Sequence, residues 1–164
     1  MGWVLIFQQY HRKYIDYFHC IAEETARLST AKKLKVGCVI VKDTRILSIG
    51  YNGTPSGWDN DCEVNGKTKP EVLHAETNAI AKVAQSNDNC KDATLFCTHE
   101  PCIQCAKLIF QSGITTVYYK HSYNAAVGRG RDFLRQGGVK AEKFDGKETV
   151  NPSVHSTMPH PRTG

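Results

Sequence analysis

The segment "PCIQCAKLIFQ" at residues 101–111 begins with two cysteines and continues as a helix-like apolar run. Cys102 and Cys105 stand three positions apart, so on one helical turn both thiols can reach one ion, and a helix N-terminus favours the thiolate form. By itself this C-x-x-C pair also fits half of a structural zinc site, a redox pair or two buried thiols. Further ligands elsewhere in the sequence have to decide between these readings.

A second helix is predicted from about His74 to Gln85, and it also begins with polar residues. Its side chains at i, i+3, i+4 and i+7 share one face, which places a carboxylate at the head of an apolar stripe. An unpaired charge facing the interior is unfavourable, so a divalent metal is expected to compensate it. His74 could then be a third ligand beside the two thiols. The stripe consists of Glu76, Ala79, Ile80 and Val83, and its counterpart in the other helix of Cys102, Cys105, Ala106 and Ile109.

Two thiolates and one imidazole are ligands that favour zinc. Three protein ligands leave the fourth tetrahedral position for water, which is typical of a catalytic zinc site. Glu76 would then be a non-ligand acid beside that water and could transfer protons. The joint pattern H-x-E, then a strand, then P-C-x-x-C is the signature of zinc nucleobase deaminases.

The elements that must position these residues alternate along the chain. A helix is predicted from Tyr10 to Leu28, followed by two strands, "KVGCVIVK" and "RILSIGYN", joined by a turn at Asp43-Thr44. Alternating helices and strands indicate an α/β domain whose sheet carries helices on both faces. Further strands are predicted at "ATLFCT", "ITTVYY" and "VKAEKF", and a further helix near Arg131.

Two segments are predicted to be irregular. Residues 53–70 are dense in Gly, Pro, Asn and Asp, and a loop of this length inside a domain is usually functional or mobile. Residues 147–164 contain three prolines and almost no apolar periodicity, so we expect a flexible tail. The remaining residues 10–146 are expected to form one domain.

Composition indicates a soluble protein of one domain. The 164 residues include 40% apolar and 23% charged residues, which argues against wholesale disorder. The apolar start "GWVLIF" is too short for a membrane span and lacks the basic segment of a secretory signal. The seven cysteines form no disulfide framework, which predicts a reducing cytoplasm, and Cys20, Cys38, Cys90 and Cys97 are expected to be small buried residues. The net charge of +5 fits a solvated surface or a phosphate-bearing ligand.

Five pieces of this sequence resemble the cytidine deaminase superfamily, and more closely its deoxycytidylate (dCMP) deaminase family. They are "VGCVIV", "GYNGTPSG", "HAETNAI", "THEPCIQCAKLI" and "QSGITTVYY". The resemblance implies a three-layer α/β/α domain with a mostly five-stranded mixed sheet. It also implies a zinc-dependent hydrolase that converts dCMP to dUMP and ammonia and so supplies dUMP for dTMP synthesis.

The resemblance assigns roles to the candidate residues. His74, Cys102 and Cys105 would hold one zinc ion. Glu76 would take a proton from the water that attacks C4 of cytosine and pass protons to N3 and to the leaving amine.

Five further residues are implied to bind the substrate. Asn52 would contact the deoxyribose, and the backbone around Ala75 and from Thr98 to Glu100 would bind the pyrimidine edge. Tyr123 is a candidate for the wall of the nucleotide site. Without the resemblance, Asn52 would be read as a turn asparagine and Tyr123 as an exposed loop residue.

The family also implies regulation and assembly. Its members often form homo-oligomeric hexamers that bind dCTP as activator and dTTP as inhibitor, with Mg²⁺ accompanying the triphosphates. The "GYNG" loop lies near that effector site, so Gly53, Thr54, Gly57 and Trp58 are candidates here. A second, structural zinc is not expected, because the long loop offers only Cys62.

Three alternatives remain open at this stage. The enzyme could act on another cytosine nucleotide, such as dCTP or CMP, because no motif marks the residues that sense the phosphates or the 2′ position. It could act on tRNA adenosine, although such enzymes have a shorter segment between the motif asparagine and the zinc histidine. A zinc-stabilised nucleic-acid-binding module would need a fourth ligand and would leave Glu76 without a role.

Overall fold

A five-stranded mixed sheet forms the centre of the protein in the computed structural model, which describes residues 10–123 and 128–146. The strand order is β2-β1-β5-β6-β7. β1 pairs antiparallel with β2 and β5, whereas β5, β6 and β7 run parallel. The strands are β1 (Gly37–Lys42), β2 (Arg45–Tyr51), β5 (Thr94–His99), β6 (Thr116–His121) and β7 (Lys140–Lys143). The sheet expected from the sequence is thereby confirmed.

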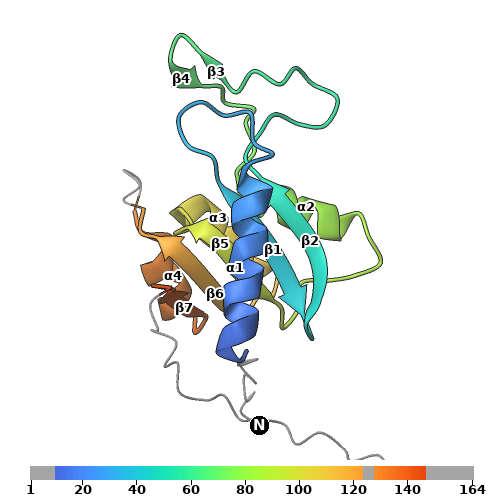
Figure 1. Ribbon diagram of the computed structural model, residues 1–164, viewed down its shortest axis with the longest axis vertical. Helices are drawn as coiled ribbons and strands as arrows, with labels where there is room; N and C mark the ends of the chain where they lie inside the picture. The colour runs from blue at the N-terminus through green and yellow to red at the C-terminus, as the bar shows by residue number, and fades with distance from the viewer. Residues whose placement is uncertain (1–9, 124–127, 147–164) are drawn as a thin grey trace, which may run out of the picture.

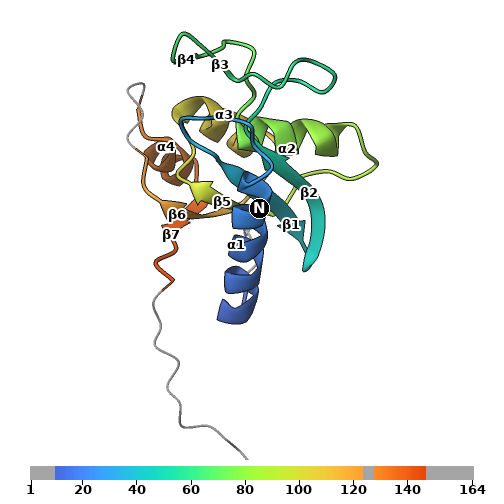
Figure 2. The same ribbon diagram turned by 45° about the horizontal axis from the view of Figure 1, so that its top comes forward.

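Helices cover both faces of this sheet. Figure 2 shows α1 on one side and α2 and α3 on the other, which gives the predicted three layers. None of the helices within the described ranges is long and apolar enough to cross a membrane. The helices are α1 (Arg12–Ala26), α2 (Ala75–Ala84), α3 (Ile103–Gln111) and α4 (Gly130–Gln136). The tail predicted at 147–164 and the apolar start lie outside the described residues.

Alternation along β5 divides the core into two parts. Phe96 faces α1, where its ring lies 5.1 Å from that of Phe18, while its neighbours Leu95 and Cys97 face α2 and α3. This follows from the period of two in a strand, and the continuous apolar run fits a strand buried on both faces. Cys38, Cys90 and Cys97 are buried as predicted. The prediction is wrong for Cys20, which is exposed because it lies on the outer face of α1.

Two glycines allow helices to approach the sheet closely. A Cβ atom at Gly37 would lie 2.2 Å from the Ala22 carbonyl oxygen in α1. A Cβ atom at Gly50 would lie 2.1 Å from the Ala75 carbonyl oxygen at the start of α2. Only glycine fits either position, and the Gly50 contact fixes where α2 begins.

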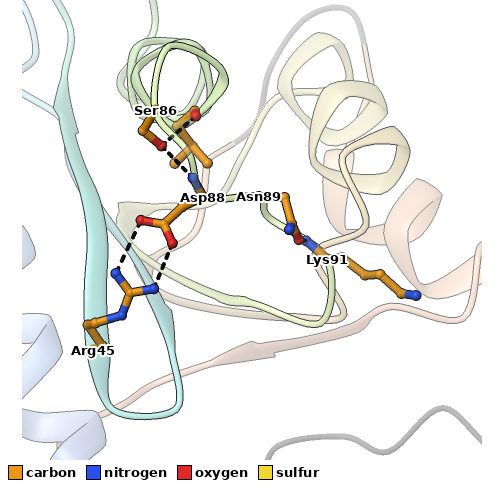
Figure 3. A network of polar contacts seen from close by, with 6 residues as sticks. Arg45, Ser86, Asp88, Asn89 and Lys91 are labelled. Atoms are coloured by element: carbon orange, nitrogen blue, oxygen red, sulfur yellow. Dashed lines mark hydrogen bonds and ion pairs between the residues drawn. The ribbon is translucent and has the colours of Figure 1, made fainter.

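The β1–β2 hairpin turns at Asp43 and Thr44, as predicted. Both residues have positive φ angles, 51° and 62°, which the tight turn of a hairpin requires. Just after the turn, Arg45 forms a two-pronged ion pair with Asp88 at 2.7 and 3.1 Å (Figure 3). This pair connects the start of β2 to the segment that follows α2.

The segment predicted as a long loop contains a short hairpin. β3 (Glu63–Val64) and β4 (Lys67–Thr68) pair antiparallel around Asn65-Gly66, whose φ angles are 50° and 70°. Asn-Gly is the usual sequence of such a turn, so the prediction of an irregular loop is wrong here. The hairpin lies beyond the end of the main sheet (Figure 1).

Candidate active site

His74, Cys102 and Cys105 meet at one point. The Nδ1 atom of His74 lies 3.6 Å from Sγ of Cys102 and 3.4 Å from Sγ of Cys105. All three ligand atoms lie within 4.8 Å of one another. A tetrahedral zinc ion with ordinary bond lengths separates a nitrogen and a sulfur ligand by about 3.5 Å. The spacing and the donor set therefore both fit zinc.

The starts of α2 and α3 place these ligands. His74 is the residue that precedes α2, and Cys102 is the residue that precedes α3. We expected both thiols within one helical turn, but Cys102 has an extended backbone, with φ −70° and ψ 166°, and forms a bridge with Arg129. The helix begins after it, and its backbone still directs the thiol toward Cys105. The positive ends of two helix dipoles thus point at the site.

Contacts among these side chains shift the pKa values of the two thiols in opposite directions. The pKa of Cys102 lies well below its usual value, because its thiolate accepts hydrogen bonds from Cys105 and His74. The pKa of Cys105 is raised, first by that same hydrogen bond and then by burial. The lowered pKa favours the thiolate form of Cys102, which is the form that binds metal ions.

Glu76 lies in the first turn of α2 and is 4% exposed. Burial is the main cause that raises its pKa. The thiol of Cys97 donates to its Oε1 atom over 3.9 Å, and hydrogen bonds from the Glu76 backbone and from Cys105 partly oppose the rise in pKa. The predicted apolar stripe behind it is present, since Ala79 and Val83 are buried and Ile80 packs against the core.

A cavity of about 210 Å³ opens beside the three ligands. Its walls come from the segment between α1 and β1, the β3–β4 hairpin, the start of α2 and the end of β5. The lining residues include His74, Ala75, Glu76 and Cys102 from the metal side, and Lys33, Asn52, Glu63, His99, Glu100 and Tyr123 from the other walls. Two of the three candidate metal ligands, His74 and Cys102, therefore face the same cavity as the buried Glu76.

Asn52 contacts the cavity wall as well as the cavity. Its Oδ1 atom accepts from the Val36 backbone N–H at 2.8 Å, and its Nδ2 atom donates to the Leu34 carbonyl at 2.8 Å. The side chain of Thr98 is turned toward β1, where its Oγ1 atom accepts from the Gly37 N–H at 3.2 Å. Of these two predicted residues, only Asn52 lines the cavity.

The other three residues predicted to bind the substrate, Ala75, Glu100 and Tyr123, all line the cavity. The Glu100 side chain is 4% exposed, and its Oε1 atom has no hydrogen-bond partner among the described residues. Its backbone N–H donates to the His121 carbonyl at 2.8 Å, which fixes this stretch to β6. Tyr123 is 43% exposed at the rim.

Sequence reasoning missed two cavity residues that can carry a positive charge, His99 and Lys33. His99 is the last residue of β5 and lies between the predicted Thr98 and Glu100. Its place between them could have identified it as a cavity residue. Its pKa is lowered, first by burial and then by nearby His121. Lys33 carries no such signal, because its position depends on how the segment before β1 packs on the hairpin.

None of the four residues proposed for an effector site lines this cavity in the described part of the chain. Gly53 pairs with Leu73 through two backbone hydrogen bonds, and Thr54 bonds to the Asp59 carbonyl. Gly57 has a φ of 85°, and Trp58 is 59% exposed. The cavity wall, as far as the structure describes it, contains none of these four.

Cys62 does not belong to a second metal cluster among the described residues, where His74, Cys102 and Cys105 form the one group that fits an ion. The Cys62 thiol is buried and lies 3.3 Å from the Thr30 hydroxyl.

Comparison with known proteins gives a consistent set of similarities. The family described as "Cytidine and deoxycytidylate deaminase zinc-binding region" matches residues 12–121. ComE operon protein 2 of Bacillus subtilis is 35% identical over 139 residues, covering 82% of this chain and 73% of that protein. Deoxycytidylate deaminase of Saccharomyces cerevisiae is 36% identical over 139 residues, covering 79% of this chain but only 44% of the yeast protein.

A solved structure has the same fold. The dCMP deaminase of the cyanophage S-TIM5, in complex with dCMP and dUMP, superimposes with a TM-score of 0.79 at 42% sequence identity. The match covers 83% of this chain and 100% of the phage chain.

Proposed function

Because this chain belongs to the cytidine and deoxycytidylate deaminase family of zinc-dependent hydrolases, we propose that it converts dCMP and water to dUMP and ammonia. The observation that carries the proposal is that His74, Cys102 and Cys105 meet beside a cavity that the buried Glu76 also lines. Similarity to the phage enzyme, whose complex contains dCMP and dUMP, supports this substrate.

His74, Cys102 and Cys105 would hold the zinc ion. Zinc bound in this way lowers the pKa of water and supplies a nucleophile near neutral pH. The donor set suits this role because three ligands keep one position open.

Glu76 would move the protons of the reaction. Its carboxylate is buried, and its raised pKa brings it closer to neutrality, where a group can both accept and release a proton. It would accept a proton from the water that adds to C4 and deliver protons to N3 and to the leaving amine. The C4–N bond then breaks, and ammonia leaves.

The cavity walls would position the nucleotide. Ala75, Thr98 and Glu100 would hold the pyrimidine edge through their backbones, and Asn52 would face the deoxyribose. Because the Asn52 amide already joins Leu34 to Val36, it would act with its remaining lone pair and hydrogen. Tyr123 would close the rim of the site.

One assay tests the substrate. Ammonia release is measured from dCMP, dCTP, CMP, deoxycytidine and a tRNA hairpin by the zinc-loaded protein. We expect kcat/KM to be higher for dCMP than for the other four compounds. A preference for dCTP or CMP would reassign the nucleotide, and release only from the hairpin would reject the proposal.

We also propose regulation and assembly of the kind known in this family. In this proposal residues 10–146 form one deaminase domain of a cytoplasmic hexamer that makes dUMP for dTMP synthesis. With Mg²⁺, dCTP would activate it and dTTP inhibit it through the surface around Gly53, Thr54, Gly57 and Trp58. The regulation is tested by measuring dCMP deamination while dCTP or dTTP is titrated. The assembly is tested by measuring the mass of the protein by sedimentation. A hyperbolic dCMP curve unchanged by either nucleotide would remove the regulation.

A further inference from the structure

The charges around the cavity are unevenly distributed. Three carboxylates, from Glu63, Glu76 and Glu100, line it, but Lys33 is the only lysine or arginine among its described lining residues. A nucleoside monophosphate brings a phosphate with about two negative charges at neutral pH. Carboxylates repel that group, so within the described cavity the phosphate of a nucleotide is attracted to the wall that carries Lys33.

The backbone that carries Lys33 is fixed on both sides. The Oε1 atom of Glu63 accepts from the N–H groups of Lys32 and Lys33 at 3.0 and 3.3 Å. Asn52 holds the chain just beyond Lys33 through its bonds to Leu34 and Val36. A residue of a loop between helix and strand is thereby presented to the cavity from a defined position.

The Lys33 ammonium is not used elsewhere in the described part of the chain. No ion pair of Lys33 occurs there, since the Glu63 carboxylate bonds to backbone N–H groups instead. His99 is a weaker candidate for a cation, because its lowered pKa leaves the ring mostly neutral at pH 7. Lys33 is therefore the available partner for an anion.

We propose that Lys33 binds the 5′-phosphate of the substrate and makes the enzyme select nucleotides over nucleosides. This inference rests on the proposed function and adds a residue that discriminates by phosphate. Lys33 would not touch the reacting atoms, so it would act on binding of the phosphate-bearing substrate. A charge-assisted contact of this kind changes kcat/KM by roughly ten- to a hundredfold.

The experiment compares Lys33→Gln with the wild-type protein on dCMP and on deoxycytidine. We expect kcat/KM for dCMP to fall roughly ten- to a hundredfold, mainly through KM, and kcat/KM for deoxycytidine to stay within about twofold. Lys33→Arg should restore most of the dCMP activity. Calorimetry with dUMP and deoxyuridine gives a second readout, in which only dUMP should bind more weakly to Lys33→Gln.

Lys35→Gln is the matched control, because Lys35 is an exposed lysine of the same segment that does not line the cavity. An equal loss on dCMP and deoxycytidine, an unchanged dCMP rate, or the same loss in Lys35→Gln would overturn the assignment of Lys33. Each of these results would leave the proposed function standing. A wild-type protein that releases no ammonia from dCMP would instead reject the proposed function.

Discussion

The Nδ1 atom of His74 lies 3.4 Å from the Sγ atom of Cys105, although 31 positions separate the two residues in the chain. The contact forms because α2 and α3 lie on the same face of the sheet and their N-terminal ends lie next to each other. Gly50 lets α2 approach the sheet closely at this end. Side chains from two helix starts are thereby brought within reach of one ion.

Loss of Cys105 should remove the metal. Cys105 is 2% exposed and faces His74, so the Cys105→Ser variant keeps the volume of the side chain but loses a thiolate ligand. After dialysis against a weak chelator, we expect zinc to fall from about one ion per chain to below roughly a tenth. Elemental analysis measures this directly. Cys90→Ser, which changes another buried thiol, should keep its zinc, and full zinc in Cys105→Ser would contradict the ligand set.

A methyl group at position 50 should separate α2 from β2. In Gly50→Ala the new Cβ atom would meet the Ala75 carbonyl oxygen at 2.1 Å and the Ala79 backbone nitrogen at 2.7 Å. We expect the free energy of unfolding in urea to fall by about 1–3 kcal/mol. In Gly53→Ala the nearest atom would be 3.7 Å away, so that variant should lose less. Equal losses would show that the close approach is unimportant.

Stability should fall at acid pH because of His19. The ring is 3% exposed, stacks 4.5 Å from Phe144, and has no hydrogen-bond partner for either nitrogen among the described residues. Burial lowers its pKa from 6.5 to about 4. Between pH 6.5 and pH 4 the His19 ring is protonated in the unfolded chain but neutral in the folded protein. The free energy of unfolding therefore keeps its full His19 contribution above pH 6.5 and decreases as the pH falls below it.

Protonation of His19 in the unfolded chain should lower the free energy of unfolding by about 3 kcal/mol at pH 4. The measurement is the free energy of unfolding as a function of pH for the wild-type protein and for His19→Phe. The difference between the two curves should change by this amount between pH 6.5 and pH 4. Parallel curves would show that His19 is not the titrating group.

Much of the fold follows from local sequence patterns. The apolar periodicity of α1 and the run of Val and Ile in β1 each had one interpretation, and the structure confirms both. The β3–β4 hairpin was missed because its strands are two residues long, too short for any periodicity, although Asn65-Gly66 marks the turn. The exposure of Cys20 was missed because a thiol fits either face of a helix.

Local sequence patterns likewise predict some residues of the candidate site and miss others. The meeting of His74 with the two cysteines, and the place of Glu76 beside them, could be expected because these residues stand near predicted helix starts in a chemically meaningful pattern. Lys33 could not, because it reaches the cavity through its backbone bond to Glu63, 30 positions away. Asn52 was predicted from its motif, but its bonds to Leu34 and Val36 depend on a loop that no local pattern specifies.

In the proposed mechanism Glu76 carries protons beside a zinc ion held by His74, Cys102 and Cys105. The most direct measurement is ammonia release from dCMP by wild-type protein and by Glu76→Gln, with zinc content determined on the same samples. We predict that both proteins hold one zinc ion and that kcat of the variant falls roughly a hundred- to ten-thousandfold. A zinc-loaded Glu76→Gln protein that deaminates dCMP at the wild-type rate would contradict the account.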